Sequence, residues 1–163
     1  MKRLPKRGRK PWGRRTRTFQ HWPSLPDEAG QVLVLSFEGM RLRSSANTRE
    51  HWSQRARIAK AQRGAAKLFA QSELRKSPLI AKARAWLVDI TRFGPRPLDS
   101  DNLAISAKHV RDGIADALGV DDGNESKVLW TYGQMKVPAS SRDVKYGVRV
   151  VICVRPEEEL TYD

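Results

Sequence analysis

The chain has 163 residues and a formal net charge of +13 at pH 7, because 31 Lys and Arg outnumber 18 Asp and Glu. This length is enough for one domain to bury a core without disulfides or structural zinc. The single cysteine, Cys153, excludes an internal disulfide, and no spacing of Cys and His fits a zinc finger. No apolar run approaches the roughly 20 residues that cross a bilayer, so we expect a cytoplasmic protein that does not enter the membrane.

The N-terminal residues 1–28 are predicted to form a basic, disordered arm. Residues 1–18 carry nine Lys and Arg and no acidic residue, a composition that buries too little apolar surface to offset the entropy of ordering. Residues 29–163 retain 22 basic and 16 acidic residues and are predicted to fold as a single domain. The arm is interpreted either as a solvated tail or as an auxiliary contact with a nucleic-acid backbone.

A strand and then a long helix are predicted in the first part of the domain. Residues 31–37, with the sequence QVLVLSF, are β-rich and apolar on both faces. Residues 48–71 place Trp and Ala near helical spacing, with Ser45 or Asn47 as the N-cap, and Pro78 follows the end of this helix. Six basic side chains line the helix: Arg49, Arg55, Arg57, Lys60, Arg63 and Lys67. They form either a solvated face or a face that contacts DNA.

The middle of the domain is predicted to contain a strand over 83–93 and the clearest helix of the chain over 102–118. Pro95 and Pro97 end the strand. In the helix, apolar residues recur at 100° spacing and form a core-facing stripe. The stripe consists of Leu103, Ala107, Val110, Ile114 and Ala117. The opposite side carries Asp101, Lys108 and Asp112. Gly119 is suited to cap the C-terminus of the helix.

Two further strands are predicted over 127–135 and 145–154, and the connecting sequence PASSRD suits a hairpin between them. The resulting order of elements is β-α-β-α-β-β. This order implies an α+β domain in which two main helices pack on a mixed β-sheet.

Residues 99–125 form an acidic segment within this basic chain. The segment has only two basic side chains, Lys108 and Arg111. Its acidic residues are Asp99, Asp101, Asp112, Asp116, Asp121, Asp122 and Glu125. Crowded carboxylates repel one another unless a cation compensates them, and hard ions such as Mg²⁺ or Mn²⁺ prefer oxygen ligands. The segment therefore suggests a metal ion held against a polyanion.

Two acidic pairs in this segment are the candidate metal ligands. Asp99 and Asp101 precede the predicted helix, and Asp121 and Asp122 follow it. The alternatives are that Asp99 or Asp101 only caps the helix, and that the second pair belongs to an ordinary polar turn. A shared ion requires tertiary folding to bring together two pairs that the helix separates by roughly 24 Å.

This combination resembles the RusA family of Holliday-junction resolvases over residues 31–154. The resemblance rests on Asp99-Ser100-Asp101-Asn102-Leu103, on Lys108, on the stretch from Ala115 to Gly119, on Asp121-Asp122 and on Lys136 near the end of the following strand. Ser44 to Asn47 also resembles the Ser-x-Asn loop that follows the first strand in this family. The resemblance implies a RusA-like fold and an Mg²⁺-dependent, structure-selective endodeoxyribonuclease in which Mn²⁺ can substitute. The implied substrate is branched DNA, four-way junctions above all.

Individual roles are carried over from the family by matching positions. The metal-binding aspartates match Asp99, Asp101 and Asp122, with Asp121 as the adjacent acid, and the choice between the last two stays open. Lys108 most resembles the active-site lysine. It follows Asp101 by seven residues instead of the expected four, and Ile105 occupies the nearer position. The alternative for Lys108 is a surface lysine paired with Asp112 four residues later.

The DNA backbone is expected to be held by basic side chains, namely Arg49, Arg55, Lys60, Arg63 and Lys136. Symmetric cutting of a junction needs two active sites, so the resemblance and symmetry imply a homodimer, with Trp52 or Trp130 as candidate anchors. One alternative is a related nuclease that cuts flaps or forks. The other is a non-catalytic basic nucleic-acid-binding protein, associated with the nucleoid or the ribosome, which leaves the acidic segment without a role.

Overall fold

The computed structural model describes residues 32–43, 50–138, 141 and 146–156. The predicted arm, residues 1–28, lies outside the described residues, as does Arg49. The elements are β1 (Val32–Glu38), α1 (Trp52–Leu74), α2 (Pro78–Ala81), β2 (Trp86–Gly94), α3 (Ser100–Leu118), β3 (Val128–Lys136) and β4 (Gly147–Val154). Both predicted helices and all four predicted strands are present, and α2 is an additional short helix.

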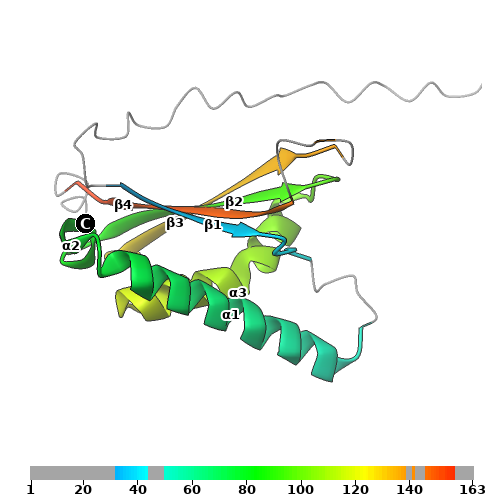
Figure 1. Cartoon of the computed structure of the whole chain (residues 1–163), viewed down its shortest axis with the longest axis horizontal. Helices are drawn as coiled ribbons and strands as arrows, with labels where there is room; N and C mark the ends of the chain where they lie inside the picture. The colour runs from blue at the N-terminus through cyan, green and yellow to red at the C-terminus, as the bar shows by residue number, and fades with distance from the viewer. Residues whose placement is uncertain (1–31, 44–49, 139–140, 142–145, 157–163) are drawn as a thin grey trace, which may run out of the picture.

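A four-stranded sheet forms one layer of the fold, and the two long helices cover one of its faces (Figure 1). The strand order is β1-β4-β2-β3. β2 and β3 run parallel, whereas β4 is antiparallel to both of its neighbours, β1 and β2. The prediction of an α+β fold with a mixed sheet and two main helices is confirmed.

The predicted hairpin between the last two strands is wrong. β2 lies between β3 and β4, so these two strands are not hydrogen-bonded to each other. Side-chain burial explains the placement, because β4 is buried along most of its length and therefore suits an interior position. β3 instead exposes Leu129, Thr131 and Met135, as is typical of a strand at the edge of a sheet.

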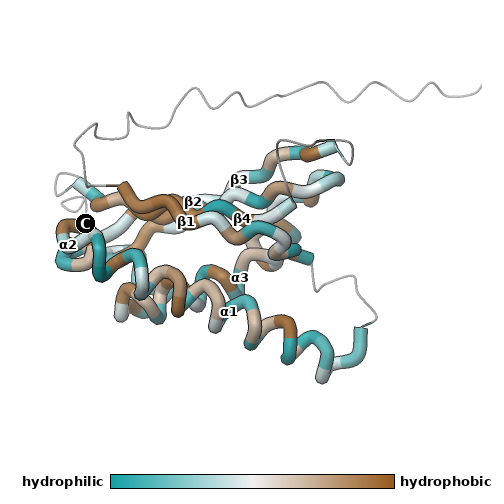
Figure 2. The backbone as a smooth tube through the Cα atoms, viewed as in Figure 1, coloured by the Kyte–Doolittle hydropathy of each residue, from teal (hydrophilic) through white to brown (hydrophobic). Residues whose placement is uncertain are grey.

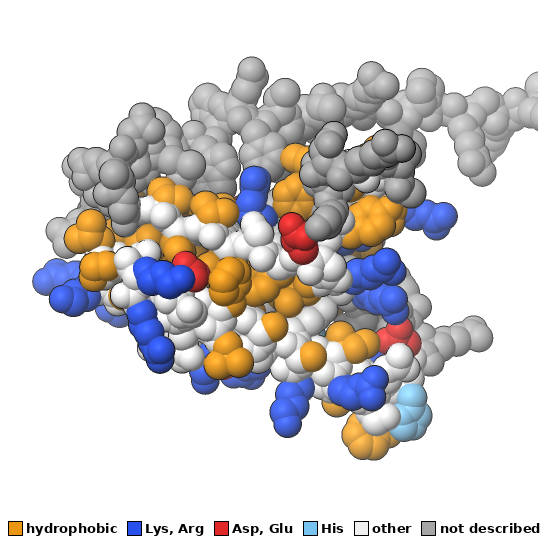
Figure 3. All heavy atoms as spheres, in the orientation of Figure 1, with side chains coloured by type: hydrophobic (Ala, Val, Ile, Leu, Met, Phe, Trp, Pro, Cys, Tyr) orange, Lys and Arg blue, Asp and Glu red, His pale blue; other side chains and the backbone are white. Residues whose placement is uncertain are grey.

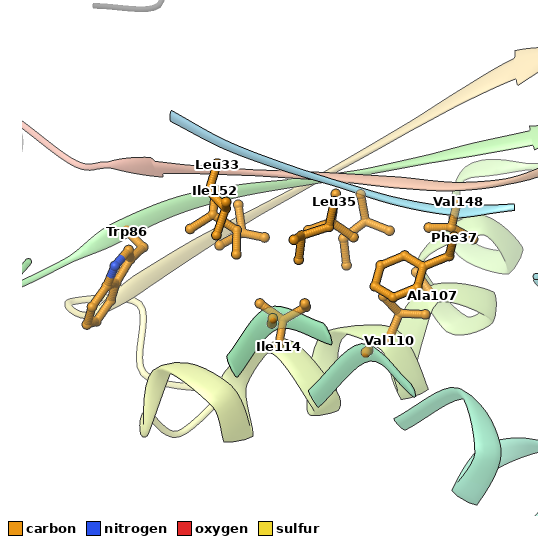
Figure 4. Packing of buried hydrophobic residues seen from close by; sticks show 14 of the residues in the cluster. Leu33, Leu35, Phe37, Trp86, Ala107, Val110, Ile114, Val148 and Ile152 are labelled. Atoms are coloured by element: carbon orange, nitrogen blue, oxygen red, sulfur yellow. The ribbon is translucent and has the colours of Figure 1, made fainter. Parts of the chain in front are cut away.

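The hydrophobic core lies between the sheet and the helices. Leu35 and Ile152 point from the sheet toward Ile114 of α3 (Figure 4). Figure 2 shows hydrophobic stretches concentrated in the strands, whereas α1 becomes mostly hydrophilic toward its N-terminal end. The predicted apolar stripe on α3 is confirmed, because Leu103, Ala107, Val110 and Ile114 are buried and Ala117 packs against the core.

α1 begins later than the sequence suggested. Its N-cap is His51, whose backbone is extended (φ −60°, ψ 141°) and whose side chain accepts a hydrogen bond from the amide of Ser53. Ser45 and Asn47, the predicted caps, lie outside the described residues and are not adjacent to the first helical residue. His51 thus caps α1 with a ring nitrogen, whereas the sequence predicted Ser45 or Asn47 as the capping residue.

The other helix boundaries follow local stereochemistry. α1 ends at Leu74, and Pro78 opens α2 as its first residue, a position where the missing amide hydrogen costs nothing. α3 ends as predicted at Gly119, whose φ of +72° favours glycine. Within the described part of the chain, no helix has both the length and the apolar character needed to cross a membrane.

α1 and α3 approach each other closely through small residues. Ala66 of α1 is fully buried. A Cβ atom added to Gly113 of α3 would lie 2.4 Å from the carbonyl oxygen of Arg63 and 2.8 Å from the Cβ atom of Ala66. Glycine at this position therefore sets the distance between the helix that carries the acidic residues and the helix that carries the basic ones.

Candidate functional site

The first acidic pair lies where α3 begins. Asp99 is the N-cap of α3, and its carboxylate accepts hydrogen bonds from the backbone amide of Asn102 at 2.9 Å and from the Asn102 side chain at 2.8 Å. The backbone bond and then the side-chain bond hold the pKa of Asp99 below its ordinary value. The interpretation of Asp99 as a helix cap is therefore confirmed, and these bonds favour the ionised form of its carboxylate.

Asp101 makes fewer and longer contacts than Asp99. It lies in the first turn of α3 and is exposed. Its one recorded contact is with the Ser100 hydroxyl at 3.4 Å, and no Lys or Arg of the described residues pairs with it. Two carboxylates thus lie two residues apart at the start of α3, and within the described residues neither forms an ion pair with Lys or Arg.

A side chain from the sheet fixes the backbone that leads into this pair. Gln134 of β3 accepts a hydrogen bond from the amide of Leu98 at 2.8 Å and donates one to the Leu98 carbonyl at 2.7 Å. Both bonds are partly buried. Because Leu98 directly precedes Asp99, the edge strand determines where the first acidic pair sits.

The second acidic pair lies past the C-terminal end of α3. Asp121 accepts a hydrogen bond from the amide of Gly123 at 3.0 Å, as is typical of a polar turn. Asp122 Oδ2 lies 2.6 Å from Nη2 of Arg111, and the backbone carbonyl of Asp122 accepts a bond from the Trp130 indole at 2.9 Å. The carboxylate of Asp122 is therefore already neutralised by an arginine of α3.

The remaining acidic residues of α3 are also paired with cations. Nζ of Lys108 lies 3.7 Å from Asp112 Oδ1, which is the alternative that the sequence analysis kept for this lysine. Arg63 of α1 binds both oxygens of Asp116, at 2.8 and 2.9 Å. The Arg63 hydrogen bond is the main cause that lowers the pKa of Asp116. The Asp116 pair thus joins α3 to α1, whereas the Lys108–Asp112 pair lies within α3.

The structure does not bring the two acidic pairs together. α3 spans 19 residues, about 28 Å of helix axis, between the first pair and the second. Among the described residues, no group of three or more His, Cys, Asp or Glu side chains is placed to hold a metal ion. On donor chemistry, Asp99 and Asp101 fit a hard cation as two carboxylate ligands. Asp122 does not join them, because its carboxylate is bound to Arg111.

The predicted DNA-contacting residues fall into two groups. Arg63 is bound to Asp116, whereas Arg55 and Lys60 of α1 are exposed and make no ion pair within the described part of the chain. Lys136, at the end of β3, is likewise exposed. Lys and Arg side chains project along the lower edge of Figure 3, where α1 runs. The predicted contact Arg49 lies outside the described residues.

Sequence reasoning missed Gln134 and Tyr132 of β3. The hydroxyl of Tyr132 accepts a hydrogen bond from Nη1 of Arg111 at 3.4 Å, so this tyrosine supports the arginine that holds Asp122. The alternation of side chains along β3 could have identified these residues, because every second side chain faces the helices. Trp130, Tyr132 and Gln134 occupy this side. A glutamine on that side, where apolar residues are expected, indicates a buried polar contact.

Comparisons with known proteins give one relative and no family. No model of a protein family matches the chain. An uncharacterized protein of Xylella fastidiosa (strain Temecula1 / ATCC 700964) is 38% identical over 98 residues. The match covers 56% of this chain and 60% of the length of that protein. The name of that protein assigns it no activity.

Proposed function

We propose that the chain is a metal-dependent endodeoxyribonuclease that cuts branched DNA, four-way junctions in particular, as a homodimer acting on nucleoid DNA in the cytoplasm. The carrying observation is the pair Asp99 and Asp101 at the start of α3. Asp99 accepts two hydrogen bonds from Asn102, and within the described residues neither Asp99 nor Asp101 is paired with a Lys or Arg. The resemblance of this segment to the RusA family supports the same activity.

Asp99 and Asp101 would hold Mg²⁺ or Mn²⁺. For Asp121 or Asp122 to act as a further ligand, as the resemblance implies, the turn after α3 would have to move toward the first pair, because release of the side chain alone does not span the length of α3. A bound ion of this kind lowers the pKa of a coordinated water and polarises a phosphodiester. Lys108 lies seven residues after Asp101 and therefore on the same side of α3, where it can offset the repulsion between carboxylate and phosphate. The role of Asp122 requires that Arg111 give up its ion pair.

Basic residues would position the DNA backbone in the proposed nuclease. Arg55 and Lys60 on α1 and Lys136 on β3 are exposed and carry no competing acid within the described residues. Contacts from such side chains to phosphates fix the register of DNA but do not read its sequence. A nuclease built in this way would select its substrate by the shape of the branch, and a two-fold junction would call for two copies of the chain.

The deciding experiment incubates the full chain with labelled four-way junction, fork and linear duplex in Mg²⁺, Mn²⁺ or EDTA. We expect metal-dependent cutting of the branched substrates. Asp101→Asn should lower cleavage by orders of magnitude, because a ligand charge is lost, while junction binding stays equal or tightens, because less negative charge faces the phosphates.

Glu73→Gln is the matched control, since within the described residues Glu73 pairs with Lys76 alone, at the far end of α1. This variant should cleave like the parent chain. Cleavage by Asp101→Asn at the parental rate would remove Asp101 from the ligand set.

A second candidate function is DNA binding without catalysis. It is favoured by the finding that no group of three potential metal ligands lies together in the described residues. The same incubation separates the two functions. Tight junction binding with no cleavage in either metal, at several enzyme concentrations, would establish the binding protein and reject the nuclease.

A further inference from the structure

The first two turns of α1 form an exposed tip. Every side chain from Trp52 to Arg57 is exposed, and α1 diverges from the sheet toward this end (Figure 1). Trp52 leaves 68% of its surface accessible, whereas the later residues Ala66 and Ala70 are fully buried against the core. The fold therefore holds the second half of α1 and presents the first half to solvent.

The exposed indole of Trp52 lies next to the ring of His51. The ring of His51 lies 5.6 Å from it, centroid to centroid, at an angle of 39°. His51 in turn contacts Ser53, with Nδ1 2.7 Å from the hydroxyl oxygen and 3.4 Å from the backbone amide. The helix cap thus fixes the His51 ring beside Trp52, and the Trp52 indole still presents most of its surface to solvent.

The charged residues of the tip itself are basic, and the acidic residue just before it, Glu50, is paired with Arg43 at 3.0 Å. Between His51 and Ser72 the sequence contains no acidic residue. Arg63 and Lys67, farther along α1, face Asp116. Arg55, Arg57 and Lys60 make no ion pair within the described residues. Within the part of the chain that the structure describes, the half of α1 that carries Trp52 is therefore also the half whose basic side chains form no ion pair.

We infer that the tip of α1 binds an unpaired nucleotide at a branch in DNA, with the Trp52 indole stacked on the base and Arg55, three residues later on the same side of the helix, against a flanking phosphate. An exposed aromatic ring beside an exposed arginine suits single-stranded nucleic acid, because every base offers a π-face and every linkage a negative charge. A second copy of the chain is a poorer occupant, since two tips facing each other would place unneutralised arginines in contact.

The inference rests on the proposed function because it takes DNA as the ligand. It does not require that the chain cleaves DNA. Bases within a continuous duplex are stacked on both sides, so Trp52 can reach a free base face only at a branch, a gap or an end. Trp52 would therefore add affinity for branched over fully paired DNA, which phosphate contacts alone do not provide.

The test measures binding in EDTA, with 2-aminopurine placed either as an unpaired base at a three-way branch or inside a fully paired duplex. The full chain is compared with Trp52→Ala, with Trp52→Phe, which keeps an aromatic ring, and with Leu68→Ala. Leu68 is the matched control, because it is 69% exposed on the same helix, beyond the tip. Circular dichroism verifies that each variant is folded.

We expect Trp52→Ala to bind the branched DNA at least about five-fold more weakly, the loss typical of one stacked base, and to bind the duplex like the parent chain. The change in 2-aminopurine fluorescence at the branch should disappear with Trp52→Ala and remain with Leu68→Ala. Trp52→Phe should retain most of the affinity.

Unchanged branch binding by Trp52→Ala would overturn the inference. So would an equal loss on both DNAs accompanied by a change from dimer to monomer in light scattering, because Trp52 would then belong to an interface between copies. A parent chain that cuts no DNA yet shows the Trp52-dependent difference would reject the proposed nuclease and leave this inference standing.

Discussion

A single side chain, Gln134, determines the position of the backbone that leads into Asp99. Its amide group satisfies both the N–H and the C=O of Leu98, a complete pairing that an aliphatic side chain cannot make. The geometry of the first acidic pair therefore depends on a residue that is distant in sequence and carries no charge. This dependence can be tested without touching either aspartate.

Replacing Gln134 by Ala should destabilise the fold by about 1 to 2 kcal/mol, because two partly buried backbone groups of Leu98 lose their partner. Urea unfolding measures the change. If the proposed nuclease is correct, the variant should also need more Mg²⁺ for half-maximal cleavage. Met135→Ala, an exposed neighbour on the other side of β3, should alter neither quantity. Equal stability of the two variants would mean that the Leu98 contact contributes nothing.

The site residues differ in how far the sequence could foresee them. The capping role of Asp99 follows from local rules, because an Asp before a helix satisfies an amide two or three residues later. The pairing of Asp122 with Arg111 could not be foreseen, since it depends on how the turn after Gly119 folds back on α3. The expected meeting of the two acidic pairs failed for the same reason. Sequence spacing gives a distance along a helix and not the direction in which the chain returns.

At the scale of elements, the contact between α1 and α3 joins the basic helix to the acidic one. The Arg63 to Asp116 ion pair lies beside the close approach at Gly113. Close packing and the ion pair therefore involve the same few turns of the two helices. Substituting one glycine in each helix tests the contribution of packing to stability separately from that of charge.

Gly113→Ala should destabilise the chain by about 1 to 3 kcal/mol from overpacking, partly offset by the higher helix propensity of Ala. The added Cβ atom would lie 2.4 Å from a backbone oxygen, which cannot rotate away. Gly64→Ala in α1 has no atom within 4 Å of its added Cβ and should stabilise by about 0.5 to 1 kcal/mol. Opposite signs in urea unfolding are expected. A stabilised Gly113→Ala would show that the helices are free to separate.

The elements themselves were largely predictable, whereas their partners were not. Apolar periodicity identified the strands and the stripe on α3, because burial imposes a period of 2 or 3.6 on the sequence. The hairpin was wrong although PASSRD is turn-like. β3 ends at Lys136 and β4 begins at Gly147, a separation longer than the two to five residues typical of hairpin loops. The length of this connection was a better guide than its turn-like composition, because a longer connection allows β4 to pair on the other side of β2.

At the scale of the whole molecule, positive charge is divided between the sequence of the arm and the exposed surface of the domain. Deleting residues 1–18 removes nine Lys and Arg. Junction binding should weaken, and the plot of log affinity against log salt should become less steep, because fewer counterions are released on binding. Arg55→Ala is the comparison, with a change of slope of up to about 0.9 for one phosphate contact. A slope that stays the same after the deletion would assign the arm a role other than DNA binding.

The position of β4 between β1 and β2 also governs the order in which the protein can form during synthesis. β1 pairs only with β4 among the described strands, and Val32 meets Cys153, more than 100 residues later. A ribosome therefore releases β1, both long helices, β2 and β3 before the strand that unites them exists. Until Gly147–Val154 emerges, β1 has no hydrogen-bonding partner, and its apolar residues remain available to chaperones or to wrong neighbours. The nascent chain should thus acquire its sheet in one late step and not strand by strand.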